Sequence, residues 1–317
     1  MAEKKITSYP KEKINILFLE NISDVAVKYF NTAGYASVKK LGGALSEEEL
    51  IAAVKNVHLL GIRSKTQVTK KVLDAAEKLQ AIGCFCIGTN QVDLSAATKK
   101  GVAVFNAPYS NTRSVAELVI GASIILIRKI IDKNKAAHEG IWLKDASGSF
   151  ELRGKTLGII GYGNIGSQLS VLAEGLGMKV IFYDVETKLP LGNAVDKKTL
   201  KDLVSNSDII TLHVPEMAST KNLINKNNLK YFKKGSILIN YARGEVVDLD
   251  ALAKFLKEGH LGGAAIDVFP WEPEKNGDKF TTPLQGLSNV LLTPHIGGST
   301  QEAQQNIGDD VSNKLFN

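Results

Sequence analysis

Cysteine is scarce in this sequence, and its placement gives no sign of metal chemistry. The only two cysteines, Cys84 and Cys86, lie in the apolar run AIGCFCIG. A metal site needs further ligands at matching spacing, and the sequence offers none nearby, so we expect no metal. We interpret the run as a buried strand of a protein from a reducing compartment.

Long apolar runs and a signal region are also missing. The longest apolar run, Leu118 to Ile127, is bounded by Glu117 and Arg128. It is shorter than the roughly 20 residues that cross a bilayer. The first residues, MAEKKITSYPKEK, are polar and contain no apolar signal region. We therefore expect no membrane partner and a cytoplasmic location.

The charge balance lacks a strong bias of either sign. Lys and Arg number 39 against 33 Asp and Glu, which gives a net charge of +6 spread along the chain. Basic residues form no block interleaved with aromatics, so we do not expect nucleic acid as a partner. Short-period repeats are absent too, which excludes a solenoid.

What is present is a regular alternation of short apolar runs and helical patterns. A chain of 317 residues with 44% hydrophobic residues normally forms two domains. The strands expected in the first third are 14–19, 57–62, 81–86 and 102–105. Ser46 and Glu49 have the spacing of a capping box at a helix start, and Gly101 stands where a helix needs a left-handed C-terminal cap.

A second alternation begins after Arg153. A turn-rich segment, NAPYSNTRS, and one long helical pattern from Ser114 to about His138 precede it. The strands expected there are 157–160, 180–183, 208–213, 236–240, 264–268 and 290–292. Such alternation is typical of βαβ units around a parallel sheet, so we predict an α/β fold with two doubly wound lobes.

A glycine motif opens the second alternation. Gly161, Gly163 and Gly166 follow the order G-x-G-x-x-G, after a buried strand and before a helix whose expected apolar face ends at Leu176. This context predicts a dinucleotide site: the glycines allow a tight turn, close approach of a pyrophosphate, and close packing of helix on strand. Asp184 ends the next strand, 18 residues beyond Gly166. A carboxylate there binds ribose hydroxyls and repels a 2′-phosphate, which favours NAD over NADP.

Three further motifs carry charged groups at the expected carboxyl ends of strands, where an open α/β sheet binds its ligands. They are INYARGEVVD, AIDVFPWEPE and LLTPHIGGST. Here the sequence resembles the D-isomer-specific 2-hydroxyacid dehydrogenase family, and the likeness covers essentially the whole chain. The resemblance implies an active site of Arg243, Glu272 and His295.

The chemistry of this reaction suits those three residue types. Oxidation of a secondary alcohol needs a base for the hydroxyl proton as hydride leaves C2, and a neutral imidazole at His295 can serve. Glu272 would orient the ring and stabilise the imidazolium that forms. Arg243 would bind the substrate carboxylate and polarise its carbonyl oxygen.

The same resemblance implies the remaining cofactor contacts. We expect Asp267 on the nicotinamide side, and His213 near the nicotinamide because it ends a strand of the same lobe. The other expected cofactor-binding residues lie in the glycine motif and in two of the charged motifs: Asn164, Ile165, Tyr241, Ala242, Gly297 and Gly298. We expect a Rossmann-type cofactor domain over residues 108–298, and a flavodoxin-like substrate-binding domain over 1–107 to which residues 299–317 return.

Several stretches are closer than family level. IGCFCIGTNQVD and FNAPYSNTRSVAELVIG resemble bacterial family members of the phosphorylated serine pathway, which implies NAD-dependent oxidation of 3-phosphoglycerate. The expected substrate-binding residues are Arg63, Ser64 and Lys65 for the phosphate, and Gly88, Thr89 and Asn90 for the carboxylate. Lys65 departs from the second arginine of those bacterial proteins and loses its bidentate fork.

Some alternatives stay open at this point. The substrate could be another D-2-hydroxy acid, such as glycerate, lactate or 2-hydroxyglutarate, or the chain could be an NAD-responsive, corepressor-like binding module. The resemblance also implies a homodimer or homotetramer, pairing through the long helix. The bacterial proteins usually carry a further carboxyl-terminal domain, whereas this sequence stops at Asn317 within a helical pattern; whether that domain was cut or is naturally absent stays open.

Overall fold

A computed structural model of the protein describes residues 9–273, 275 and 277–316. The chain forms two compact units, one of Met1–Asn111 with Thr300–Asn317 and one of Thr112–Ser299. The first eight residues of the polar amino-terminal segment, and Glu274 at the end of the AIDVFPWEPE motif, lie outside the described residues. No described helix is long and apolar enough to cross a membrane.

The first unit is built on a five-stranded parallel sheet in the order β2-β1-β3-β4-β5. Its strands are β1 Asn15–Phe18, β2 Ser37–Lys40, β3 Leu59–Ile62, β4 Ala81–Cys84 and β5 Ala103–Asn106. Its helices are the 3-10 turn η1 Lys11–Lys13, then α1 Asp24–Thr32, α2 Glu47–Val54, α3 Lys70–Ala75, α4 Leu94–Lys100 and α11 Gln301–Phe316.

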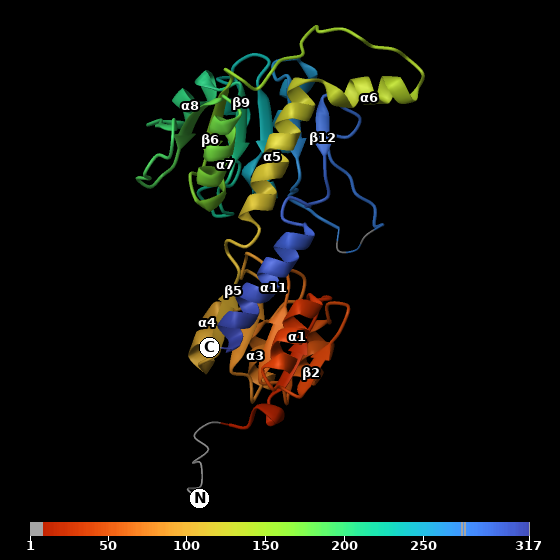
Figure 1. Ribbon diagram of the computed structural model, residues 1–317, viewed down its shortest axis with the longest axis vertical. Helices are drawn as coiled ribbons and strands as arrows, with labels where there is room; N and C mark the ends of the chain where they lie inside the picture. The colour runs from red at the N-terminus through yellow and green to blue at the C-terminus, as the bar shows by residue number, and fades with distance from the viewer. Residues whose placement is uncertain (1–8, 274, 276, 317) are drawn as a thin grey trace, which may run out of the picture. The chain divides into compact units, whose positions relative to one another are not determined.

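Both faces of this sheet are covered by helices. Leu60, Ile62 and Ile82 lie in the hydrophobic cluster with α2, α3 and α4. Ile16 and Phe18 lie in the cluster with α1 and α11, and these two helices lie side by side (Figure 1). The near-continuous apolar strands follow from this, because a parallel sheet between two helical layers buries both faces.

The second unit is built on a seven-stranded parallel sheet in the order β12-β11-β10-β9-β6-β7-β8. Its strands are β6 Thr156–Ile160, β7 Lys179–Tyr183, β8 Val195–Asp196, β9 Ile209–Leu212, β10 Ile237–Asn240, β11 Gly263–Ile266 and β12 Val290–Leu292. Its helices are α5 Thr112–Ile127, α6 Ile130–His138, α7 Asn164–Gly175, α8 Leu200–Asn206, α9 Lys226–Leu229, the 3-10 turn η2 Gly244–Val246, and α10 Leu249–Lys257.

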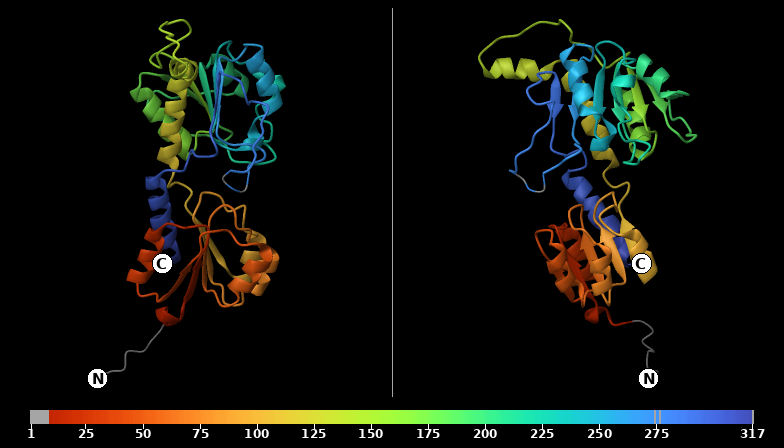
Figure 2. Two further views of the ribbon diagram at one scale, coloured as in Figure 1. Left: turned by 90° about the vertical axis from the view of Figure 1, so that its right-hand side faces the viewer. Right: turned by 180° about the vertical axis from the view of Figure 1, so that it is seen from behind.

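Alternate residues of the central strands face two separate hydrophobic clusters. Ile159 and Ile239 pack with α5 and α7, whereas Ile160 and Leu238 pack with α8, α9 and α10. Figure 2 shows the helices on both faces of this sheet. The predicted doubly wound α/β fold is therefore confirmed, with the strand order reversing between β6 and β9. Ligands of such sheets bind beside this reversal, at the carboxyl ends of the strands.

Two strands were not predicted, and both lie at a sheet edge. β2, Ser37–Lys40, has the sequence SVKK and only half-buried or exposed side chains. β8, Val195–Asp196, has two residues, both exposed. Short, polar edge strands lack the apolar run that marks a central strand, so the pattern gave no signal for them.

The single long helix expected from Ser114 to about His138 is wrong. The chain breaks between α5 and α6 at Lys129, which adopts the left-handed conformation with φ 51°. Phe150 N–H donates to the Ile127 carbonyl at 3.1 Å, and Ser149 Oγ donates to the Arg128 carbonyl at 3.3 Å. A segment more than 20 residues away thus satisfies the carbonyls at the end of α5, which helical periodicity cannot reveal.

The predicted capping residues of two other helices are confirmed. Ser46 and Glu49 form the predicted capping box at α2, and Gly101 caps α4 with φ 73°. Placing Leu176 on the buried face of α7 is wrong, because the helix ends at Gly175 and the side chain is 43% exposed.

We predict that Ser46→Ala lowers the free energy of unfolding by about 1 kcal/mol, because the first-turn N–H of Glu49 loses its acceptor. Urea denaturation monitored by circular dichroism measures the change. Ser95→Ala, at an exposed position within α4, is the matched control and should shift stability by no more than a few tenths of a kcal/mol. Equal midpoints for Ser46→Ala and the unaltered protein would contradict the capping assignment.

Candidate active site

The glycine loop after β6 leaves an open cradle. Gly161 has φ 92°, and a Cβ there would lie 2.4 Å from the His213 carbonyl oxygen. A Cβ on Gly166 would lie 2.3 Å from the Gly161 carbonyl oxygen. Both positions therefore require glycine for close packing, whereas Gly163 is exposed, with no described atom within 4 Å of its Cβ position.

Helix α7 begins beside this open position. Gly163 is its N-cap and supplies no side-chain hydrogen bond. The first-turn N–H groups, which belong to Asn164, Ile165 and Gly166, are those that an α-helix leaves without partners within itself. With the positive end of the helix dipole, they fit the pyrophosphate of a dinucleotide.

Asp184 joins this cradle from the end of β7. Its Oδ2 accepts the Tyr162 N–H at 2.7 Å, and its Oδ1 accepts the Glu186 N–H at 2.9 Å. The carboxylate thus holds the glycine loop against the neighbouring strand. Its charge and its place beyond the second strand also suit a ribose whose 2′ position carries a hydroxyl.

His213 follows β9 on the other side of the cradle. Its Nε2 lies 3.0 Å from Thr211 Oγ1, and its buried Nδ1 has no hydrogen-bond partner among the described residues. Burial lowers the pKa of His213 to about 3, so the ring is neutral. Tyr241 and Ala242 are buried in the hydrophobic clusters, and burial raises the pKa of Tyr241 to about 12.

The carboxylate and imidazole expected to act together are hydrogen-bonded. Glu272 Oε2 lies 2.8 Å from His295 Nδ1, and Glu272 Oε1 accepts the Phe269 N–H at 3.1 Å. With Nδ1 donating to the carboxylate, the neutral ring keeps its acceptor lone pair on Nε2. The arrangement therefore presents Nε2 of His295 as a base.

Arg243 belongs to the same cluster. Its charge reaches both Glu272 and His295 and acts to lower the pKa of each. Gly244 lets the loop after β10 pack closely against the loop after β11, because a Cβ on Gly244 would lie 2.0 Å from the Phe269 carbonyl carbon. The buried Asn240 shapes the turn by donating to the Arg243 carbonyl at 2.9 Å and accepting the Ala242 N–H at 3.1 Å.

The loop carrying His295 is held by Asp267. This buried carboxylate accepts N–H groups from Ile296 at 2.8 Å and Gly297 at 2.7 Å, and the Thr293 hydroxyl at 2.6 Å. His295 itself is left-handed, with φ 52°, and its N–H donates to the Asp267 carbonyl at 2.7 Å. Asp267 therefore stabilises a backbone conformation that non-glycine residues seldom adopt. Gly298 follows in the same turn, partly exposed.

The acid–base pair shifts the pKa values of both partners. The hydrogen bond to Glu272 raises the pKa of His295, against the opposing effect of burial. Burial raises the pKa of Glu272, but the His295 hydrogen bond and charge outweigh it, so the pKa of the carboxyl is lowered overall. Because the His295 pKa is raised, its contribution to stability is complete below its ordinary value of 6.5 and is lost as the pH rises through the folded value.

The expected substrate residues lie in the first unit, on two neighbouring loops. Arg63, Ser64 and Lys65 follow β3, and Gly88, Thr89 and Asn90 follow β4. The two strands pair in register, so the loops meet at the carboxyl edge of the sheet. All six residues are partly or fully exposed.

Sequence reasoning missed Asn240, Gly244 and Thr293, which build the turns around the catalytic cluster. The glycine directly after Arg243 was the visible signal, since it marks a close backbone approach. For the other two, hydrogen-bond partners within the folded turns decide the role.

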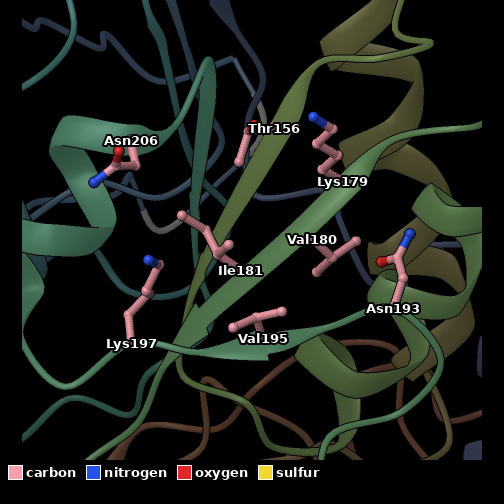
Figure 3. A pocket seen from close by; sticks show the side chains of 8 residues that line it. All are labelled: Thr156, Lys179, Val180, Ile181, Asn193, Val195, Lys197 and Asn206. Atoms are coloured by element: carbon pink, nitrogen blue, oxygen red, sulfur yellow. The ribbon is translucent and has the colours of Figure 1, made fainter.

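A separate cavity of about 340 Å³ lies on the second unit, lined by Thr156, Lys179, Val180, Ile181, Asn193, Val195, Lys197 and Asn206. Thr156 and Lys179 are the first residues of β6 and β7, so the cavity opens at the edge opposite the glycine loop. In Figure 3 the amino groups of the two lysines lie apart and do not converge on one point. Among the described residues, no group of three His, Cys, Asp or Glu side chains could hold a metal ion.

We predict that Glu272→Gln lowers the pKa of His295, because the carboxylate that stabilises the protonated ring is lost. An NMR titration of the histidine ring protons measures the shift. Glu258→Gln removes a carboxylate 3.8 Å from Lys254 Nζ, elsewhere in the same unit, and should leave the titration unchanged. If both variants titrate like the unaltered protein, the hydrogen-bonded pair does not exist in solution.

Comparisons with known proteins show the family to which the chain belongs. Residues 120–297 match the family model described as D-isomer specific 2-hydroxyacid dehydrogenase, NAD binding domain. The chain is 57% identical over 309 residues to D-3-phosphoglycerate dehydrogenase of Escherichia coli (strain K12), covering 98% of this chain and 75% of that protein. The protein of the same name from Dictyostelium discoideum is 52% identical, covering 98% and 76%.

Solved structures show the same fold. D-lactate dehydrogenase from Aquifex aeolicus, complexed with NAD and lactic acid, superposes with a TM-score of 0.81 at 28% identity, covering 95% of this chain and 94% of that one. The TT0316 protein from Thermus thermophilus gives 0.85 at 29% identity, covering 96% of each. The chain therefore belongs to the D-isomer-specific 2-hydroxyacid dehydrogenase family, and it is an NAD-dependent oxidoreductase.

Proposed function

We propose that the protein oxidises D-3-phosphoglycerate to 3-phosphohydroxypyruvate with NAD. The observation that carries the reaction class is the cluster of Arg243, Glu272 and His295, with His295 Nδ1 2.8 Å from the carboxylate. The substrate follows from the relatives named D-3-phosphoglycerate dehydrogenase, which are 49% to 57% identical over almost the whole chain.

In this proposal His295 is the general base. Nε2 of the neutral ring takes the hydroxyl proton of the substrate as the C2 hydrogen leaves with its electron pair, and a carbonyl forms at C2. Bound NAD supplies the acceptor for that hydride. Glu272 keeps the ring in the required tautomer and stabilises the imidazolium that results.

Arg243 binds the acid end of the substrate. Its guanidinium offers a planar set of donors to the carboxylate and to the oxygen on C2. The positive charge also stabilises negative charge on that oxygen as the proton leaves. The turn built by Asn240 and Gly244 fixes the place of this group beside the acid–base pair.

We also assign substrate contacts to residues of the first unit. We assign Arg63, Ser64 and Lys65 to the phosphate and the loop Gly88–Asn90 to the carboxylate. Guanidinium and ammonium groups bind phosphate oxygens through charge-assisted hydrogen bonds, and the exposed loop residues after β3 and β4 support this assignment. In the second unit, we assign the cofactor to the glycine loop, with Asp184 on the ribose and with Asp267 and His213 toward the nicotinamide.

We also propose that the chain forms a homodimer or homotetramer in the cytoplasm. The surface of α6 and the segment after it exposes large apolar side chains, namely Ile130, Ile141, Trp142, Leu143 and Phe150. Trp142 is 85% exposed, and apolar patches of this kind support a protein interface. Two free cysteines suit a reducing compartment.

We predict that the oxidation rate rises with pH through the titration of His295, because only the neutral ring accepts the proton. The midpoint should lie above the ordinary histidine value of 6.5, since Glu272 raises the pKa. Steady-state kcat against pH measures it, with chemistry shown to be limiting by a substrate isotope effect. His295→Asn should lower kcat by roughly 10²- to 10⁴-fold.

His260→Asn is the matched control for that experiment. The His260 ring bonds the Phe232 carbonyl at 3.0 Å and takes no part in the cluster, so the pH profile should keep its midpoint. A profile that stays flat from pH 6 to pH 9 in the unaltered protein would remove His295 from the role of base.

We predict that Arg63→Ala raises KM for D-3-phosphoglycerate by roughly 10- to 100-fold, the value of one charge-assisted hydrogen bond. KM for D-glycerate, which has no phosphate, should change little. Lys70→Ala removes an exposed lysine of the same unit, paired with Asp74, and serves as the control in an absorbance assay of NADH. Equal turnover of glycerate and phosphoglycerate, with no effect of Arg63→Ala, would favour an unphosphorylated substrate.

A further inference from the structure

A buried carboxylate that the proposed reaction does not use lies beside the loop assigned to the phosphate. Glu20 follows β1, is 8% exposed, and adopts the left-handed conformation with φ 57°. Its Oε1 accepts N–H groups from Arg63 at 3.0 Å and Thr66 at 2.9 Å, and its Oε2 accepts the Lys65 N–H at 3.0 Å. Three backbone donors of one loop thus bind a single carboxylate.

The position of Glu20 in the sheet connects this contact with ligand binding. In the order β2-β1-β3-β4-β5, β2 is added on one side of β1 and the later strands on the other, so the strand order reverses between β1 and β3. Doubly wound sheets bind ligands at this point. Backbone N–H groups at such a point commonly bind the anionic group of a ligand. Here the protein's own carboxylate takes that place, so an incoming anion is left to the side chains of the loop rather than to most of its backbone.

A second buried side chain connects this loop to the next. Gln91 is 3% exposed, and its Nε2 lies 2.8 Å from the Arg63 carbonyl, 3.3 Å from the Gly88 carbonyl and 3.2 Å from Cys86 Sγ. Cys86 Sγ in turn lies 3.2 Å from the Gly88 carbonyl. The carboxyl ends of β1, β3 and β4 are therefore joined in sequence by Glu20 and Gln91.

We propose that Glu20 and Gln91 are positioning residues that hold the phosphate loop and the carboxylate loop at a fixed separation for one phosphorylated hydroxy acid. This rests on the proposed function, which assigns Arg63–Lys65 and Gly88–Asn90 to the substrate. Neither side chain touches the substrate in this account. Their effect on the reaction comes through the place at which Arg63 and Gly88 are held.

Glu20→Gln tests the first half of this proposal. The carboxamide has nearly the same size, but its NH₂ group meets backbone N–H donors that the carboxylate accepted, so the loop loses its anchor. We expect KM for D-3-phosphoglycerate to rise about tenfold, and kcat to stay within about twofold, because the groups that exchange the proton and hydride are unchanged. A loss of stability alone would lower the concentration of active enzyme, and therefore the apparent kcat, without raising KM.

A second readout needs no substrate. Cys86 is partly exposed and lies within the network, whereas Cys84 in the same run is fully buried. In Glu20→Gln, a maleimide pulse followed by mass spectrometry should modify Cys86 several times faster than in the unaltered protein, with Cys84 unmodified in both. Cys84 thereby reports any general unfolding.

Two further variants complete the design. Glu49→Gln removes a carboxylate that accepts one backbone N–H at 2.9 Å in the capping box of the same unit, and it should change neither KM nor Cys86 labelling. Gln91→Ala leaves Glu20 in place and should raise KM and Cys86 labelling in the same direction, which keeps the test decisive if Glu20→Gln does not fold.

The outcomes separate this proposal from the proposed function. Unchanged Cys86 labelling in Glu20→Gln and Gln91→Ala overturns the positioning role whatever the substrate. Faster labelling with unchanged KM also overturns it, because the held loops would then not serve the substrate. Failure of the unaltered protein to turn over D-3-phosphoglycerate instead overturns the proposed function, a result that the labelling arm does not share.

Discussion

The structure depends on carboxylates that accept backbone N–H groups where parallel strands end. Loops that leave a parallel sheet have no ladder partner, so their buried N–H groups need other acceptors. Asp184 holds the glycine loop, Asp267 the His295 loop and Glu20 the loop after β3. Each acidic residue stands at or just beyond the carboxyl end of its own strand and reaches the loop of a neighbouring one.

This arrangement explains how irregular loops come to hold reactive side chains in fixed positions. Glu272 uses one oxygen on the Phe269 N–H and the other on His295 Nδ1, so the carboxylate that anchors its own turn also orients the base. The glycines do the complementary work. Gly161, Gly166 and Gly244 let neighbouring loops approach to distances that a Cβ would forbid. The charged side chains on those loops are thereby brought close together.

The chemistry was easier to predict than the architecture that supports it. G-x-G-x-x-G and a carboxylate beyond the next strand are local signals, since each lies in a short motif with its strand beside it, whereas the resemblance to the family supplied Arg243, Glu272 and His295. Predictions of helices and strands were less accurate where an element depends on residues far away in the sequence. The break at Lys129 depends on hydrogen bonds from Phe150 and Ser149. The polar edge strands β2 and β8 form only because they pair with β1 and β7.

The sequence by itself determined the α/β class, most strand positions, the capping of α2 and α4, and the glycine motif that follows β6. These follow from periodicity and from chemistry confined to a few neighbouring residues. Tertiary structure alone decided which acceptors satisfy the loop N–H groups, where α5 ends, and that Glu20, Gln91, Asn240 and Thr293 build the turns. The physical reason is that a hydrogen bond between residues far apart in the chain exists only once the sheet has brought their strands side by side.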